Sequence, residues 1–111
     1  MLLTHYFVYI IRCENNHYYT GYTTDLTRRL KEHFSGSPKC KYTRSFKALN
    51  LAQSWKITGK KAQAMRIERY IKTLSRVEKE SLIANPNRLA HYFVGLLNSR
   101  ETLLIKPFGK L

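Results

Sequence analysis

Arg29 and His33 are the most suggestive pair of reactive side chains in this sequence. They stand four residues apart in a segment with helical periodicity, so a cation and an imidazole project side by side from one helix face. Glu68 is a third candidate, because helical spacing places it beside Ala64 and Ile71 on an apolar stripe. Burying a carboxylate there is costly unless it is ion-paired or binds a cation. The sequence therefore predicts a functional or an ion-paired role for Glu68.

Two tyrosines stand in neighbouring runs rich in β-branched and aromatic residues. Alternate side chains of a strand share one face of it. The residues grouped in this way are Phe7, Tyr9 and Ile11 in the first run, and His17, Tyr19 and Gly21 in the second. Tyr9, Tyr19 and Gly21 thus take positions that can face one another. Either tyrosine taken alone would equally suit cross-strand packing.

The elements that position these residues can be predicted along the chain. Residues 6–13 and 17–23 are two strands joined by turn residues, which is a hairpin. A helix is predicted over residues 25–35, because Thr23 or Thr24 can cap its start. This helix carries both Arg29 and His33.

The rest of the chain completes the set of predicted elements. Residues 60–74 have helical periodicity, and Ser75 to Glu78 has the form of a capping box that starts another helix. The segments predicted after residue 35 are a basic, mobile loop over 35–46, a strand over 48–57, helices over 60–74, 75–84 and 89–97, and an extended tail over 103–105.

The charge of the chain points to a polyanionic partner. Its 111 residues suit one domain and carry a formal net charge of +13. Between Arg28 and Lys79 there are fifteen Lys or Arg residues and three acidic ones, whereas ordinary surfaces mix both signs. DNA, RNA and an anionic membrane would all attract such a surface. The cations assigned to nucleic-acid binding are Arg28, Lys39, Lys41, Arg44 and Lys72.

Other classes of protein fit the sequence less well. There is no apolar run long enough to span a membrane and no signal peptide, so we expect a cytoplasmic protein without a membrane partner. Cys13 and Cys40 lie in unlike contexts and are expected to be free thiols. Zinc-ligand spacing, a phosphate-binding loop and a serine nucleophile elbow are all absent from the sequence.

These residues resemble the GIY-YIG nuclease family. Val8-Tyr9-Ile10 matches its first triplet and Tyr19-Thr20-Gly21 its second, followed at family spacing by Arg29 and His33. Further likeness to small bacterial members related to the amino-terminal nuclease domain of UvrC lies in three segments, Lys41-Tyr42-Thr43-Arg44, Arg66 to Lys72 and Leu74 to Glu80. The resemblance covers about residues 5 to 83.

The resemblance implies both a fold and a reaction. The fold is α+β, a three-stranded antiparallel sheet flanked by helices, with Gly21 structural at the site. One divalent metal, Mg²⁺ or Mn²⁺, would be held by Glu68, and the reaction would be hydrolysis of a phosphodiester. Arg29 would stabilise the charge on the phosphate. Tyr9 would be the base, assisted by Tyr19 or His33, although His33 titrates near neutrality and is a rival for that role.

This sequence departs from the family pattern in places. Val8 and Thr20 replace a glycine and an isoleucine without touching a reacting group, and Tyr22 stands where repair enzymes often carry lysine. Tyr18, Tyr22 and Tyr42 could stack on bases or only pack. Asn85 and Asn87 match a family asparagine by order alone.

The domain division and the partners follow from the extent of the resemblance. Residues 1–84 would form the nuclease domain, and residues 85–111 an extension that packs on it, builds a dimer surface or touches substrate. The leading hypothesis is an endonuclease for branched, damaged or distorted DNA, with RNA less favoured, because no sequence-reading module accompanies the site. The alternatives are a non-catalytic nucleic-acid-binding protein and a subunit that a protein partner activates.

Overall fold

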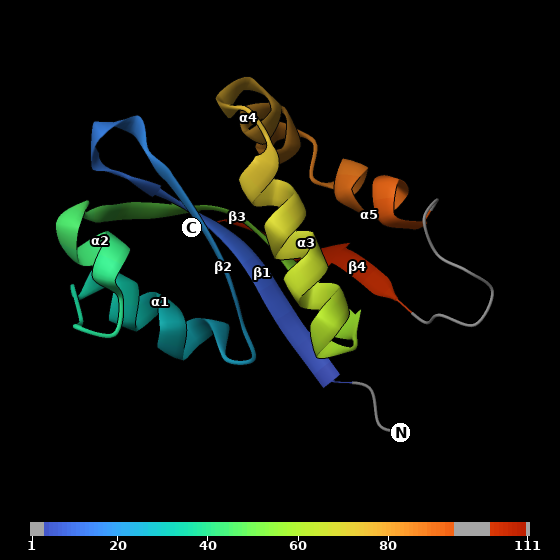
Figure 1. The fold of residues 1–111 in the computed structure, drawn as a ribbon, viewed down its shortest axis with the longest axis horizontal. Helices are drawn as coiled ribbons and strands as arrows, with labels where there is room; N and C mark the ends of the chain where they lie inside the picture. Colours follow the sequence, from blue (N-terminus) through green and yellow to red (C-terminus); the bar gives the residue numbers. More distant parts are fainter. Residues whose placement is uncertain (1–3, 95–102, 111) are drawn as a thin grey trace.

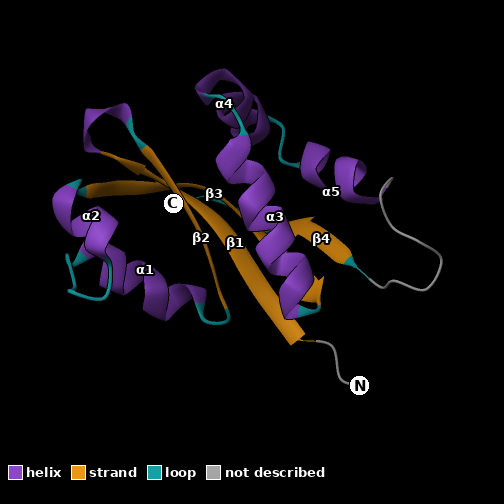
Figure 2. Cartoon of the chain, viewed as in Figure 1, coloured by secondary structure: helices purple, strands orange, loops and turns teal. Residues whose placement is uncertain are grey.

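A computed structural model describes residues 4–94 and 103–110 (Figures 1 and 2). In chain order the elements are β1 (Thr4–Cys13), a 3₁₀ turn η1 (Glu14–Asn16), β2 (Tyr18–Thr23), α1 (Leu26–Phe34), α2 (Lys41–Ser45), β3 (Ala48–Gly59), α3 (Lys61–Thr73), α4 (Arg76–Ala84), α5 (Asn87–Val94) and β4 (Leu104–Pro107). The α+β class and the antiparallel pairing expected from the sequence are confirmed.

The sheet has four strands in the order β2-β1-β3-β4, so the expectation of three strands was wrong. The extra strand is β4, which runs antiparallel to the end of β3 and pairs Ile105 with Ile57. The sequence predicts only an extended tail in this segment, without a partner. Its pairing depends on a strand some fifty residues earlier, which no local pattern reveals.

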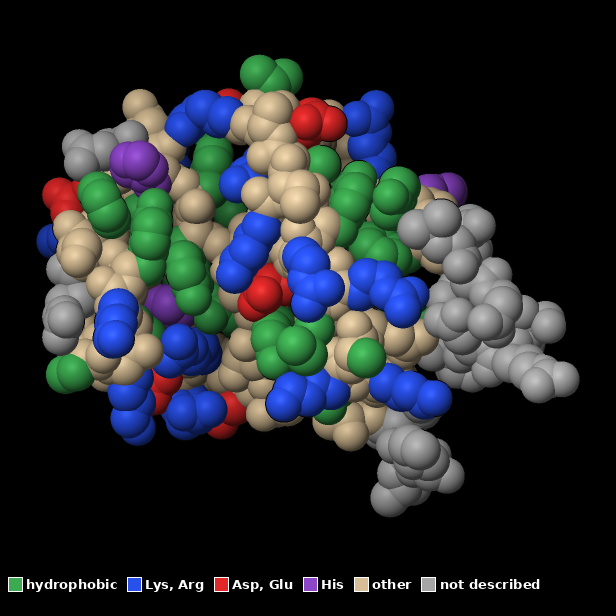
Figure 3. All heavy atoms as spheres, in the orientation of Figure 1, with side chains coloured by type: hydrophobic (Ala, Val, Ile, Leu, Met, Phe, Trp, Pro, Cys, Tyr) green, Lys and Arg blue, Asp and Glu red, His purple; other side chains and the backbone are tan. Residues whose placement is uncertain are grey.

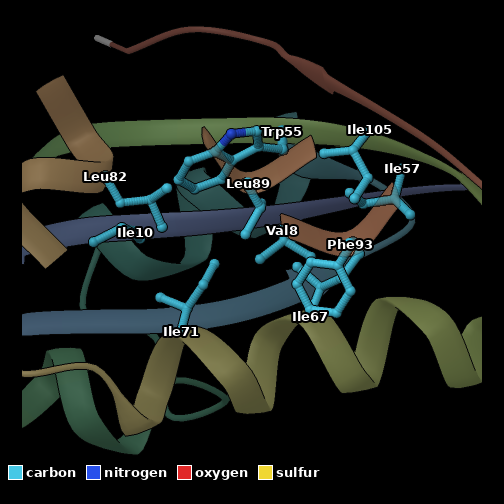
Figure 4. Packing of buried hydrophobic residues seen from close by; sticks show 10 residues of the cluster. All are labelled: Val8, Ile10, Trp55, Ile57, Ile67, Ile71, Leu82, Leu89, Phe93 and Ile105. Atoms are coloured by element: carbon cyan, nitrogen blue, oxygen red, sulfur yellow. The ribbon is translucent and has the colours of Figure 1, made fainter. Parts of the chain in front are cut away.

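Helices cover the two faces of the sheet separately. Even-numbered residues of β1 face α3, α4 and α5, and odd-numbered ones face α1, because strand side chains alternate. The first core contains the ten residues Val8, Ile10, Trp55, Ile57, Ile67, Ile71, Leu82, Leu89, Phe93 and Ile105 (Figure 4). The second contains Tyr9, Ile11, Cys13, Leu26, Leu30, Ala48 and Leu51. Tyr9 therefore lies on the α1 side of the sheet.

The helix starts follow local hydrogen bonding. Asp25, not Thr23 or Thr24, is the N-cap of α1, and its carboxylate accepts the backbone N–H of Arg28 at 3.1 Å. The capping box before α4 is confirmed, since Ser75 and Glu78 each accept the other's backbone N–H. These caps settle where the two helices begin.

The loop predicted over 35–46 contains a short helix, α2, so that prediction was wrong in part. Five residues are too few for a visible periodicity, and the helix is stabilised by burying Cys40 and Thr43 against the α1 side of the sheet. Both Cys13 and Cys40 are free, as expected, and both are buried. In the described part of the chain no helix is long and apolar enough to cross a membrane.

The C-terminal segment contributes to the core. Leu89 and Phe93 of α5 and Ile105 of β4 belong to the same buried cluster as the strands. The helix predicted over 89–97 begins earlier, at Asn87, and its last residues lie outside the described ones. The division of the chain at residue 84 stays a prediction.

Candidate active site

Tyr9 lies at the centre of the sheet, opposite Gly21 of β2. A Cβ placed on Gly21 would stand 2.5 Å from the Tyr9 hydroxyl oxygen and 2.7 Å from Cζ. The tyrosine ring therefore occupies the space in which any other residue would hold its side chain. The sequence expectation that Gly21 is structural is consistent with this close approach, and it explains how so large a ring fits at 1% exposure.

His33 links Tyr9 to Thr43, a residue to which the sequence alone assigns no role. His33 Nε2 lies 2.9 Å from the Tyr9 hydroxyl, and its Nδ1 lies 2.8 Å from Oγ1 of Thr43. All three side chains are at most 2% exposed. The motif Lys41-Tyr42-Thr43-Arg44 marks the segment, but nothing in it singles out the threonine. α2 brings Thr43 to the far side of the imidazole from β1.

Burial sets the protonation states of this cluster. Burial and then the nearby Arg29 guanidinium lower the pKa of His33 from 6.5 to about 4, so the imidazole is neutral at physiological pH. Burial and the adjacent Tyr19 raise the pKa of Tyr9 well above its ordinary value, and Arg29 opposes that rise. Tyr9 at rest is therefore a neutral phenol beside a neutral imidazole.

Arg29 is held in place by Glu32. Nη1 of Arg29 donates to Oε1 of Glu32 at 3.0 Å, and the Arg29 side chain is 23% exposed. Burial lowers the pKa of Arg29, but Glu32 and Tyr9 together raise it above its ordinary value, which keeps the guanidinium charged. The structure thus brings Arg29, His33 and Tyr9 together, with the Arg29 side chain partly open to solvent.

A row of aromatic rings extends from the cluster to the β1–β2 turn. Tyr19 lies 5.1 Å from the His33 ring and stacks on Tyr42 at 5.2 Å, and Tyr42 is followed by Phe46 at 5.1 Å (centroid distances). Tyr42 is partly buried and packs against the rings of Tyr19 and Phe46.

The other two tyrosines in question also have protein partners. The Arg76 guanidinium lies over the Tyr18 ring at 5.0 Å, and the Tyr22 ring lies 6.5 Å from that of Tyr6. Of the two asparagines matched by order, Asn85 donates its side-chain amide to the carbonyl of Ser81. Asn87 is the first residue of α5.

Glu68 lies at the border of the buried face of α3, not inside it as the spacing indicates. Its side chain is 19% exposed and pairs with Lys72 at 3.3 Å, so the ion pair expected as one alternative forms with a basic residue of the same helix. Tyr70, two residues on, stacks on Tyr92 of α5 at 4.3 Å. Because residues two apart lie on opposite sides of a helix, Glu68 faces away from α5 and toward the β2 edge.

No hydrogen bond or ion pair joins Glu68 to Tyr9 or Arg29 among the described residues. The site therefore has two parts, a buried cluster on the α1 side of β2 and a carboxylate on the α3 side. Within the described ranges no three His, Cys, Asp or Glu side chains gather to hold a metal ion. Glu68 would act as a ligand singly.

The cations assigned to nucleic-acid binding differ in their availability. Arg28 is paired with Asp25 and Glu32, Lys39 approaches Glu32 at 3.9 Å, and Lys72 is paired with Glu68. Lys41 is exposed, and the side chain of Arg44 lies outside what the structure describes. The sequence-predicted cations are thus largely engaged with carboxylates.

A second group of exposed cations lies on α3 and is not among those assigned to nucleic-acid binding from the sequence. Lys61, Arg66 and Arg69 are exposed on α3 and form no ion pair with a described residue. Figure 3 shows Lys and Arg side chains gathered over this helix in the middle of the viewed face. Helical spacing could have found them, because all three lie opposite the apolar stripe. We call these three residues the α3 cations.

Comparison with known proteins accords with the motifs. Residues 5–81 match the family described as GIY-YIG catalytic domain. UPF0213 protein BH0048 of Halalkalibacterium halodurans is 45% identical over 82 residues, which are 74% of this chain and 84% of that protein. UPF0213 protein YhbQ of Escherichia coli O127:H6 is 39% identical over 104 residues, 94% of this chain and 98% of the relative.

One solved structure is also similar. The solution NMR structure of the UPF0213 protein BH0048 from Bacillus halodurans is 43% identical, covers 73% of this chain and 84% of its own, and has a TM-score of 0.45. The motif order, the sequence relatives and the domain match agree with one another. The chain belongs to the GIY-YIG nuclease family and, within it, is similar to the small UPF0213 proteins.

Proposed function

We propose that this chain is a metal-dependent endonuclease that hydrolyses phosphodiester bonds of DNA. The observation that carries the proposal is the buried hydrogen bond of 2.9 Å between the Tyr9 hydroxyl and His33 Nε2, beside the Arg29 guanidinium. A buried phenol that is hydrogen-bonded to an imidazole beside a cation, with pKa values shifted on both rings, is an arrangement typical of active sites. Membership of a nuclease family supports the same activity.

Each residue of the buried cluster has a role that its chemistry suits. Tyr9 would take the proton of the attacking water, and His33 would take the proton of Tyr9. Arg29 would bind the charge that accumulates on the phosphate oxygens, because its guanidinium is fixed by Glu32 and stays charged. Tyr19 would assist from the adjacent position in β2, where its ring contacts both Tyr9 and His33.

Glu68 suits a single hydrated cation. Mg²⁺ keeps most of its water and needs only one or two carboxylates together with substrate phosphate, so one partly exposed glutamate is a sufficient protein ligand. Mn²⁺ takes the same oxygen ligands. When bound, the ion supplies Lewis-acid stabilisation of the phosphate charge. Lys72 would have to release Glu68 before the ion binds.

The substrate would lie across the β2 edge, between the buried cluster and α3. The α3 cations would contact phosphates on one side, and Lys41 with the other cations of residues 28–44 on the other. We propose DNA with a branch, lesion or distortion as the preferred substrate, because none of the described elements forms a sequence-reading module.

The proposal is tested by incubating the full chain with Mg²⁺ or Mn²⁺ and a panel of duplex, flap, fork and four-way-junction DNA. Wild type should produce cleavage products, and Tyr9→Phe and Glu68→Ala should not. The matched controls are Tyr6→Phe, a partly buried tyrosine of the same strand on its other face, and Glu80→Ala, an exposed glutamate paired with Arg76. Products that persist in both site variants, or no products from wild type, would overturn the assignment.

A non-catalytic nucleic-acid-binding protein is the second candidate. The ion pair between Glu68 and Lys72 favours this candidate, because Lys72 occupies the only carboxylate that is assigned to a metal. This candidate predicts binding that weakens with salt and no cleavage of any DNA in the panel, with or without the metal. Cleavage that depends on Glu68 would exclude it.

A further inference from the structure

Thr43 lies on the opposite side of His33 from Tyr9, the two residues to which the proposed function assigns the proton transfer, and it is 2% exposed. Its Oγ1 is hydrogen-bonded to His33 Nδ1 at 2.8 Å, in a direction that depends on the tautomer of the imidazole. The same oxygen lies 3.4 Å from the carbonyl oxygen of Cys40. A threonine hydroxyl has one proton to donate, and a carbonyl oxygen can only accept. If the proton goes to Cys40, Oγ1 must accept the N–H of His33 Nδ1.

The hydrogen bonding of the Tyr9 hydroxyl indicates the same tautomer of His33. The Tyr9 oxygen interacts with the Arg29 guanidinium, which carries only donors. If His33 also presented an N–H at Nε2, the Tyr9 proton would face two donors and have no acceptor in a buried site. With Nδ1 protonated, Nε2 has a free lone pair that accepts the Tyr9 O–H at 2.9 Å. Only this direction satisfies every group.

We infer that Thr43 is a positioning residue that holds His33 in the Nδ1–H tautomer, so that Nε2 faces Tyr9 as a proton acceptor. The hydrogen bonds run from Tyr9 through His33 and Thr43 to the carbonyl of Cys40, and the Arg29 guanidinium lies beside the Tyr9 end. The inference concerns the proton arrangement at the site, and its catalytic consequence rests on the proposed function.

The consequence is a balanced proton transfer. The Tyr9 O–H bond breaks and an N–H bond forms at Nε2 of His33, giving a phenolate beside an imidazolium. The phenolate is stabilised by Arg29, and the imidazolium keeps its Nδ1–H bond to Thr43. Among the described residues, the charged and titratable groups around this pair are Tyr9 from β1, Tyr19 from β2, Arg29 and Glu32 from α1, and Cys40 before α2, and the uncharged hydroxyl of Thr43 completes the surroundings of His33.

Thr43 selects the tautomer and the ring orientation of a neutral His33. A carboxylate has the same role toward the histidine of a hydrolase triad. A carboxylate would favour the imidazolium at rest. A hydroxyl instead leaves His33 neutral, which agrees with the lowered pKa of this imidazole. Tyr9 and His33 therefore rest as a neutral pair and separate charge only when Tyr9 gives up its proton.

The test compares Thr43→Val, which removes the hydroxyl at nearly constant volume, with Thr43→Ser, which retains it. Thr20→Val is the matched control, because Thr20 is a buried threonine whose hydroxyl has no hydrogen-bond partner within the described residues. The tautomer of His33 is read from nitrogen chemical shifts of the full chain labelled with ¹⁵N-histidine. Cleavage rates are measured against pH with the same variants.

We expect wild type, Thr43→Ser and Thr20→Val to show Nδ1–H at His33, and Thr43→Val to shift toward Nε2–H. Cleavage by Thr43→Val should fall roughly 10- to 100-fold in kcat with little change in KM, as for other histidine-orienting partners. The serine variant should recover most of the rate. An Nε2–H tautomer in wild type, or wild-type tautomer and rate in Thr43→Val, would overturn the inference. Because the tautomer is read without substrate, an inactive wild type would defeat the proposed function and leave this inference to be decided by the spectrum.

Discussion

The Tyr9 ring lies against the backbone of Gly21 so closely that no larger residue fits at position 21. Gly21→Ala should displace the Tyr9 hydroxyl, destabilise the fold by about 1 to 3 kcal/mol as other overpacked cores are destabilised, and abolish cleavage. Urea unfolding and the cleavage assay measure the two effects.

A double-mutant cycle with Tyr9→Phe makes this prediction specific. Removing the hydroxyl takes away the atom nearest to the added Cβ, so Gly21→Ala should cost less in the Tyr9→Phe protein than in wild type. Equal costs in both proteins would show that the clash is not with the Tyr9 hydroxyl.

The buried His33 makes stability depend on pH. The unfolded chain binds a proton at His33 near pH 6.5, whereas in the folded chain burial holds the pKa at about 4. Since the unfolded state binds more protons between these values, its free energy falls relative to the folded state as pH decreases. Wild type should lose about 3 kcal/mol of unfolding free energy from His33 between pH 7 and pH 4, at about 1.4 kcal/mol per pKa unit.

The contribution of His33 is isolated with His33→Gln, which cannot titrate. Glu32 and Glu78 also have lowered pKa values, through hydrogen bonds to Arg29 and to Ser75, and lose stability in acid with the same sign in both proteins. The difference between wild type and His33→Gln should therefore shrink as pH falls. A difference that stays constant would mean that His33 titrates normally in the folded state.

The α3 cations should dominate the interaction with DNA phosphates. Arg66→Ala with Arg69→Ala should weaken binding and reduce the slope of log affinity against log salt by about 2, near 0.9 for each phosphate that the variant no longer neutralises. Fluorescence anisotropy at several salt concentrations measures this slope. Arg28→Ala is the control and should have a smaller effect, because Arg28 already pairs with Asp25 and Glu32. A larger effect of Arg28→Ala would reverse the assignment.

Glu68 and Lys72 should have opposite effects on metal binding. Mn²⁺ and Lys72 compete for the same carboxylate, so Lys72→Ala should tighten Mn²⁺ binding and Glu68→Gln should remove it. Electron paramagnetic resonance of free Mn²⁺ measures both without reference to cleavage. Glu80→Gln, in the comparable pair with Arg76, should leave Mn²⁺ binding unchanged. Equal binding by wild type and Glu68→Gln would remove Glu68 as the ligand.

The sequence by itself determined the features that depend on neighbours along the chain. The alternation of β1 and β2, the spacing of Arg29 and His33, and the capping box of Ser75 and Glu78 are all local, and each forms as expected. The position of Gly21 opposite Tyr9 follows from the same alternation once the hairpin is recognised.

Only the tertiary structure decided the contacts between distant segments. The pairing of β4 with β3 and the burial of Thr43 behind His33 depend on which surfaces meet. Burial also lowers the pKa of His33, whereas the sequence alone places its titration near neutrality. Local periodicity specifies which face of an element is apolar, whereas hydrogen-bond direction and desolvation arise only when three or more elements close around the same side chain.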